Sequence, residues 1–244
     1  MDTVYSAASI TTEKPMAREL KVPVHKGGRL RKRRLKIWGT DYLHYRYLWP
    51  NIESMIRKAL QTVPNDAITV LDVGCGHKPY RELFGGVSYV GLDYGTLDSS
   101  PDVVGDATRL PVRSGAVDVV FSTQVIEHVR NPEQMVMECA RVLRPGGSLI
   151  ITGPLYWPLH EEPYDFHRFT KYAFANYLME AGFETWNIVE DGGDWAQICL
   201  SISLHLNQRW LAPVRAVVNS LGLFLDWAFP SRLSPANYTV LARR

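Results

Sequence analysis

Two glycines separated by one residue, Gly74 and Gly76, interrupt an apolar segment and are followed by Pro79. Glycines at a turn from strand to helix let backbone amides approach a polar or anionic ligand at the start of the helix. The dinucleotide fingerprint would need a further glycine at the position of Pro79, so a pyrophosphate site for NAD or FAD is disfavoured. The spacing predicts a ligand site at this turn that is not a dinucleotide site.

Three acidic residues stand where they could complete that site. Asp72 precedes the first glycine by two residues, Asp93 ends the next apolar segment, and Asp106 follows Gly105. A carboxylate at the end of the second strand can accept hydrogen bonds from both hydroxyls of a ribose. Asp93 is therefore the candidate for binding a nucleoside sugar.

The segment 153–170 is unusually rich in histidine, acidic and aromatic residues for a connection. A histidine whose pKa lies near the working pH suits the removal of a proton from a hydroxyl group. The candidate bases are His128, His160 and His167, with Asp165 or Glu161 available to orient one of them; each histidine also has a purely structural reading. A metal site made of His160, Glu161, Asp165 and His167 is disfavoured because no pair of histidines has helical i, i+4 spacing, and we expect no metal.

Strands and helices alternate along the chain, which predicts a parallel, doubly wound sheet. In such a sheet the ligands lie at the carboxyl ends of the strands, so residues 124–128 and 153–170 should face the reaction. Asn131 as N-cap and Pro132 as first helical residue begin one helix, and a helix is also expected from Arg81 onwards. The expected strands are 67–73, 88–92, 117–122, 148–152, 183–190 and 238–242. The further helices are 132–143 and 170–182, the second capped by Thr170.

On these motifs, residues 68–153 resemble the class I S-adenosylmethionine-dependent methyltransferases, specifically the branch called methyltransferase type 11. The resemblance implies a Rossmann-like, mostly parallel seven-stranded α/β sheet with an antiparallel last strand, and S-adenosylmethionine (SAM) as cofactor. It implies that Asp72, Gly74 and Gly76 line the methionine part, that Asp93 holds the ribose and that Asp106 with the Ala107 amide meets the adenine. The remaining residues assigned to the cofactor site are Cys75, Tyr94 and Gln124.

The glycine loop departs from the family pattern at one position. The full motif is Asp-x-Gly-x-Gly-x-Gly, and Lys78 stands at the last glycine. We expect this lysine to alter the packing of the loop and to weaken cofactor binding without abolishing it.

Residues 191–236 form an insertion before the last strand that carries far more apolar residues than a hairpin tip requires. Such a surface has to be covered. We expect helices that act as a lid over an apolar substrate or as a homodimer interface. A peripheral membrane contact is a third reading, less favoured because the insertion contains no lysine.

Residues 1–36 carry ten Lys or Arg against three acidic residues, whereas the remainder of the chain has a net charge of −5. The composition predicts a flexible basic arm before a methyltransferase domain at 37–244. Such an arm could bind RNA phosphates or anionic lipids. The segment after the fourth strand lacks the Asn/Asp-Pro-Pro-Tyr of DNA adenine methyltransferases, which disfavours DNA as the substrate, and a nucleic-acid partner is the less favoured reading overall.

The three cysteines are far apart and lack metal-ligand spacing, so we expect free thiols in the cytoplasm. The first twenty residues contain no continuous apolar segment typical of a secretory signal. The function expected from the sequence is methyl transfer to a small molecule, with an oxygen of a sugar, lipid-linked or aromatic compound as the favoured acceptor. The alternatives are an RNA methyltransferase that uses the basic arm, and a SAM-binding partner protein without catalysis.

Overall fold

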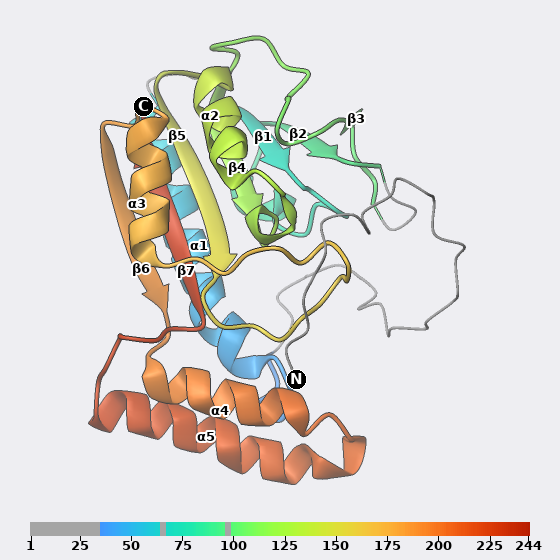
Figure 1. Cartoon of the computed structure of the whole chain (residues 1–244), viewed down its shortest axis with the longest axis vertical. Coiled ribbons are helices and arrows are strands. Elements are labelled where there is room, and N and C mark those ends of the chain that lie inside the picture. The colour runs from blue at the N-terminus through green and yellow to red at the C-terminus, as the bar shows by residue number, and fades with distance from the viewer. Residues whose placement is uncertain (1–34, 64–66, 96–98) are drawn as a thin grey trace, which may run out of the picture.

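The computed structural model describes residues 35–63, 67–95 and 99–244, so most of the basic arm predicted at 1–36 lies outside the described residues. A seven-stranded sheet in the order β3-β2-β1-β4-β5-β7-β6 forms the centre of the fold (Figure 1). All neighbouring strands are parallel except β7, which is antiparallel to both β5 and β6. The predicted fold class is confirmed. The strands are β1 (Thr69–Val73), β2 (Ser88–Asp93), β3 (Val103–Val104), β4 (Val117–Thr123), β5 (Leu143–Pro154), β6 (Thr185–Asp191) and β7 (Asn237–Arg243).

Helices cover the two faces of the sheet unequally (Figure 1). α2 (Pro132–Val142) and α3 (Lys171–Glu180) pack on one face, where Met135 and Phe174 join a buried cluster with Val120. α1 (Tyr42–Thr62) covers the other face, and its buried side chains meet Val70 and Phe121. Alternate residues of the buried strands point to opposite faces, so each strand contributes to both clusters.

Side-chain caps begin both helices of the first face, as their sequences predict. The Asn131 side chain accepts a hydrogen bond from the Gln134 amide at 3.1 Å, with Pro132 at the first helical position. The Thr170 hydroxyl accepts from the Ala173 amide at 3.2 Å. Each cap satisfies an amide that has no partner within its helix.

The helix expected from Arg81 onwards was wrong: the chain forms one turn of 3-10 helix, η2 (Arg81–Phe84). The glycine loop takes up half of the connection between β1 and β2, and Gly85 ends the turn with a φ of +66°. Too few residues remain for an α-helix before β2 begins. α1, from before the sheet, covers the face that such a helix would occupy. The strand expected at 148–152 begins earlier, at Leu143, so residues 144–147 lie within β5.

The insertion at 191–236 forms two helices, α4 (Asp194–His205) and α5 (Ala212–Ala228), joined through the short η4 (Arg209–Leu211). The two helices pack on each other and on the N-terminal part of α1, where Leu43, Cys199 and Leu200 form a small buried cluster (Figure 1). Among the described residues, no helix is both long and apolar enough to cross a membrane. Large apolar side chains stay exposed on the outer side of the insertion, among them Trp210, Val217, Leu221, Phe224 and Trp227.

Candidate functional site

The site lies at the carboxyl edge of the parallel strands, on either side of β1. The chain leaves β1 toward β2 and returns on the other side as β4, which makes this edge a topological switch point. Loops that leave β1, β2, β4 and β5 meet there. β6 also ends at this edge because it runs antiparallel to β7, which is itself antiparallel to β5, and so the insertion begins beside the site.

The glycine loop has the backbone that the sequence predicts. Gly74 has a φ of +74° and Gly76 a φ of +49°, both in the region that disfavours side chains. A Cβ atom on Gly74 would overlap the Val125 side chain, whereas nothing lies within 4 Å of a Cβ built on Gly76. Gly74 is therefore required for packing, and Gly76 leaves open space above the loop in which a ligand can approach the backbone.

The end of β2 holds this loop in place. The amides of Gly74 and Cys75 donate to the Leu92 carbonyl at 2.8 Å and 3.0 Å, and the Gly76 amide donates to the Asp93 carboxylate at 2.9 Å. Asp93 thus stands at the edge of the open space, while the Cys75 side chain is buried. Tyr94 follows with 73% of its side chain exposed, free to lie against a ligand.

Asp72 lies below the loop rather than in the open space. Its side chain is buried and accepts a hydrogen bond from the Tyr89 hydroxyl. Burial raises the pKa of Asp72 to about 7, and burial also raises the pKa of Tyr89. The Asp72 carboxylate therefore stands where it supports the loop between β1 and β2.

Lys78 adopts the backbone of the glycine that it replaces, with a φ of +55°. Its ammonium group pairs with Asp102 at 2.6 Å, and that carboxylate also accepts from the Gly91 amide at 2.8 Å. Both bonds lower the pKa of Asp102. The absence of a side chain on Gly91 gives the lysine room to cross β2. The pair between Lys78 and Asp102 is the change in loop packing that we expect from this lysine. The effect of Lys78 on cofactor affinity stays a prediction.

The other residues assigned to the cofactor have partners within the protein. Asp106 accepts from the amide and the hydroxyl of Thr108 at 2.7 Å and 2.8 Å, which fixes the turn that carries Ala107. Gln124 has a φ of +54°. Its side-chain amide donates to the Thr152 hydroxyl and to the Asn237 side-chain oxygen. Its side chain thus ties the end of β4 to β5 and β7, while its backbone borders the site.

Of the three candidate histidines, the structure brings His128 and His160 together. Their ring centroids are 4.7 Å apart. His128 Nδ1 lies 2.8 Å from the Tyr164 carbonyl, and His160 Nδ1 lies 3.2 Å from the Asp165 carboxylate. Burial lowers the pKa of His160, and the nearby His128 lowers it further. The Asp165 carboxylate thus fixes the Nδ1 side of the His160 ring.

His167 does not join this pair. Its Nε2 lies 3.4 Å from the Arg130 carbonyl, and its ring packs 5.7 Å from that of Phe169. These contacts support the structural reading of this histidine.

Glu127 belongs to the site although sequence reasoning missed it. It lies in the short η3 (Ile126–His128) after β4, its side chain is fully buried, and neither carboxylate oxygen has a hydrogen-bond partner among the described residues. Burial raises its pKa to about 8. An acid beside a histidine directly after a central parallel strand is the signal that could have found it.

The loop 153–170 closes over Glu127. The amides of Phe166 and His167 donate to the Glu127 carbonyl at 2.9 Å and 3.2 Å. The Arg168 guanidinium donates to both oxygens of Asp165 at 2.6 Å and 2.7 Å, and these bonds hold the pKa of Asp165 well below its usual range. The same guanidinium donates to the Trp157 carbonyl. This two-bond pair, the fork between Arg168 and Asp165, fixes the loop. It also fixes the Asp165 carboxylate that orients His160.

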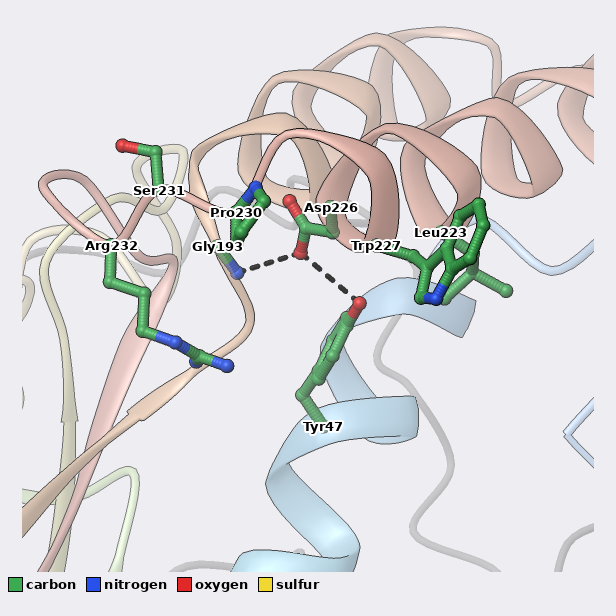
Figure 2. A pocket seen from close by; sticks show the side chains of 8 residues that line it. All are labelled: Tyr47, Gly193, Leu223, Asp226, Trp227, Pro230, Ser231 and Arg232. Carbon is green, nitrogen blue, oxygen red and sulfur yellow. Dashed lines mark hydrogen bonds between the residues drawn. The ribbon is translucent and has the colours of Figure 1, made fainter.

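A separate cavity of about 150 Å³ lies where α1 meets the insertion (Figure 2). Asp226 stands at its centre and accepts from the Tyr47 hydroxyl at 3.1 Å and from the Gly193 amide at 2.8 Å, as the dashed lines in Figure 2 show. It also accepts from the Ala196 amide and so caps α4. These polar groups satisfy one another, which indicates a structural joint rather than a site for the reaction.

Comparisons with known proteins find methyltransferases. The family model of the methyltransferase domain matches residues 71–151. A protein of Mycolicibacterium smegmatis named "Probable S-adenosylmethionine-dependent methyltransferase" is 37% identical over 132 residues, covering 47% of this chain and 51% of its own. An "Uncharacterized methyltransferase" of Mycobacterium sp. (strain JLS) is 28% identical over 181 residues, covering 68% of this chain and 69% of its own.

The chain thus spans about half the length of the first of these relatives. The crystal structure of a SAM-dependent methyltransferase from Archaeoglobus fulgidus has the same fold, with a TM-score of 0.54 at 16% identity over 82% of this chain and 97% of that chain. Residues 71–151 thus match a methyltransferase domain, and the chain has the fold of the class I S-adenosylmethionine-dependent methyltransferases.

Proposed function

We propose that the protein transfers the methyl group of SAM to a small-molecule acceptor, with an oxygen of a sugar, lipid-linked or aromatic compound as the favoured atom. The observation that carries this proposal is the position of the Glu127, His128 and His160 side chains. They follow β4 and β5 on the sheet edge that also holds Gly76 and Asp93. A cofactor loop and a cluster able to take up a proton thus share one edge.

The glycine loop and Asp93 fit the cofactor of the family. The open space above Gly76 admits the amino-acid part of SAM, and the Asp93 carboxylate at its edge can accept from ribose hydroxyls. When bound, SAM supplies a methyl group on a positively charged sulfur that needs no further activation. The residues of the chain hold the acceptor atom in line with the bond between the methyl carbon and the sulfur.

His128 and His160 are the proposed proton acceptors. Nδ1 of His128 faces a carbonyl oxygen, which can only accept, so in the neutral ring Nδ1 carries the hydrogen and Nε2 keeps its lone pair. The same holds for His160, whose Nδ1 faces the Pro158 carbonyl and the Asp165 carboxylate. As the acceptor oxygen forms its bond to the methyl carbon and the bond from that carbon to sulfur breaks, its proton passes to an Nε2 atom.

The insertion supplies one wall of the acceptor site in this proposal. The Trp157 side chain, in the loop that carries His160, packs on the cluster formed by Leu43, Cys199 and Leu200. α4 is therefore connected to the loop over the site, which supports a lid role and an acceptor with an apolar part. Three free thiols, all within the described residues, support a reducing compartment such as the cytoplasm.

The test uses SAM with a labelled methyl group and a cell extract divided into lipid, small polar, RNA and protein fractions. We expect label in the lipid or small polar fraction. General-base catalysis contributes about 10²–10⁴-fold, so H160Q should reduce the rate by a comparable factor. H205Q, at the exposed end of α4, is the matched control and should keep the wild-type rate. Label confined to RNA or protein would overturn the proposed acceptor class.

A further inference from the structure

Three possible metal ligands converge at the acceptor side of the site. One donor atom from each of Glu127, His128 and His160 lies within 4.8 Å of the others. Glu127 and His128 come from the turn after β4, and His160 comes from the loop 153–170. Two ligands about 2.1 Å from the same ion lie roughly 3–4 Å apart, so small side-chain rotations bring all three to binding distance.

Both histidines are oriented as metal-binding histidines usually are. A ligating imidazole commonly donates its other N–H group to a carbonyl or a carboxylate, which fixes the ring and its tautomer. His128 has this partner in the Tyr164 carbonyl at 2.8 Å, and His160 has it in the Asp165 carboxylate at 3.2 Å. Each ring therefore keeps an Nε2 lone pair for an ion, and His128 Nε2 lies 4.0 Å from a Glu127 oxygen.

Glu127 is the second, independent indication of a ligand. Its side chain is fully buried, and both carboxylate oxygens are without a hydrogen-bond partner in the described parts of the chain. A buried carboxylate in a native protein is normally paired or bound to a metal. Arg168 does not meet this need, because its guanidinium is bound to Asp165 and to main-chain carbonyls.

We propose that Glu127, His128 and His160 bind one divalent transition-metal ion of the Zn²⁺ type. Two imidazoles and one carboxylate form the protein ligand set of many catalytic zinc sites and leave at least one position for water or substrate. The Glu161 carboxylate lies 3.8 Å from His128 Nε2 on the exposed side and adds negative charge near that position. The expectation of no metal rested on ligands within 153–170, without the pair Glu127 and His128 that the fold brings to His160.

The catalytic consequence rests on the proposed function, whereas binding of the ion does not. An ion at this position would face the acceptor, and coordination of a hydroxyl group lowers its pKa. The two histidines would then be ligands in place of proton acceptors, and the proton of the coordinated hydroxyl would pass to water. Loss of either histidine would affect the ion and the reaction together. Direct measurement of metal binding, without SAM or acceptor, separates the two proposals.

The experiment uses the untagged full chain, stripped with a chelator and titrated with ZnCl₂ against a chromophoric competitor. Bound metal per chain is counted by mass spectrometry. We expect one high-affinity zinc ion. The variants H160Q and E127Q should bind it at least about 100-fold more weakly, because changes even to residues behind the ligands cost about 10–100-fold. H167Q removes a neighbouring histidine outside the cluster and should keep the wild-type affinity.

Melting temperatures show whether each variant is folded. H160Q alters a partly exposed loop residue, so it serves as the test even if E127Q does not fold. Absence of a high-affinity ion from the wild-type chain would overturn the proposal. So would folded H160Q that binds zinc as tightly as the wild type, or H167Q that weakens binding to the same extent as H160Q. Loss of methyl transfer in a chain that still binds zinc would count against the proposed function alone.

Discussion

At the residue scale, the backbone of the glycine loop follows from local requirements, while the surroundings of Glu127 do not. Positive φ angles favour glycine at both Gly74 and Gly76, and close packing against Val125 restricts Gly74 further, so their pattern is visible in the sequence. Glu127 becomes a buried, unpartnered acid only because the loop 153–170, about 30 residues later, bonds to its carbonyl. Such a contact has no local signal.

Replacing Gly74 by alanine tests the packing of the loop. A side chain at a φ of +74° costs about 1–2 kcal/mol, and the new Cβ also overlaps Val125. G74A should therefore lower the free energy of unfolding by more than the backbone cost and weaken SAM binding. The double variant G74A/V125A relieves the overlap alone and should recover part of both losses, as measured by urea denaturation and calorimetry. No recovery would show that Val125 does not restrict this position.

His44 predicts a loss of stability in acid. Its side chain is 6% exposed in α1, its ring centroid is 4.7 Å from that of Trp157, and burial lowers its pKa to about 4 from 6.5. Between pH 6.5 and about pH 4, His44 is protonated in the unfolded chain and neutral in the folded chain. The free energy of unfolding therefore falls as the pH falls. The loss from this group should be about 2 kcal/mol between about pH 7.5 and about pH 5.

Urea denaturation at the two pH values measures this effect. H44L removes the titrating group and should lose about 2 kcal/mol less than the wild type over the same interval. H205Q removes an exposed histidine and should keep the wild-type pH dependence. An H44L variant with the full acid-side loss would contradict the assignment to His44.

At the element scale, the sequence predicts most strands and the capped helices because their signals are local. Asn131 and Thr170 cap α2 and α3 as expected. The helix expected after Pro79 fails because Gly85 ends it after one turn, and the replacement of that helix by α1 depends on how distant segments pack. The same holds for the candidate site. The sequence predicts which loops form the site, because their signals are local, but it does not predict the contacts between these loops.

The fork between Arg168 and Asp165 predicts how the loop 153–170 is held. Lysine cannot make the two parallel bonds of a guanidinium, so R168K should loosen the loop while the sheet stays folded. The amides of Phe166 and His167 should exchange hydrogen about tenfold faster or more, because a bond to a charged group contributes about 1.5–3 kcal/mol.

A second fork provides the control for this variant. Arg141 binds both oxygens of Glu138 at 2.7 Å and 2.8 Å, away from the loop. R141K should lower the melting temperature without changing exchange at the two loop amides. Equal protection of these amides in R168K and the wild type would show that the fork does not hold the loop.

Gly222 fixes the close approach of α5 to α4. A Cβ at this position would lie 2.8 Å from the Cβ of Cys199 and 3.2 Å from a Leu43 methyl carbon. G222V should therefore destabilise the chain by about 1–3 kcal/mol, the usual cost of overpacking. S220V, two residues earlier on the exposed side, should change stability far less. Denaturant unfolding of both variants measures the difference, and equal effects would contradict the packing argument.

At the scale of the whole molecule, one edge of the sheet gathers the glycine loop after β1, η3 after β4, the loop 153–170 and the start of the insertion (Figure 1). The parallel topology produces this gathering, because every parallel strand ends at that edge. The insertion buries one side against α1 and exposes apolar side chains on its other side. Composition predicts the apolar surface, and its partner stays a prediction.

The most direct test of the account is a calorimetric titration of the full chain with SAM. We expect one SAM per chain and no binding of NAD. D93N should bind SAM about 10–100-fold more weakly, because it loses charge-assisted bonds to the ribose. E82Q, an exposed acid in η2, should keep the wild-type affinity. Equal affinity of D93N and the wild type, or binding of NAD in place of SAM, would contradict the assignment of the carboxyl edge as the SAM site.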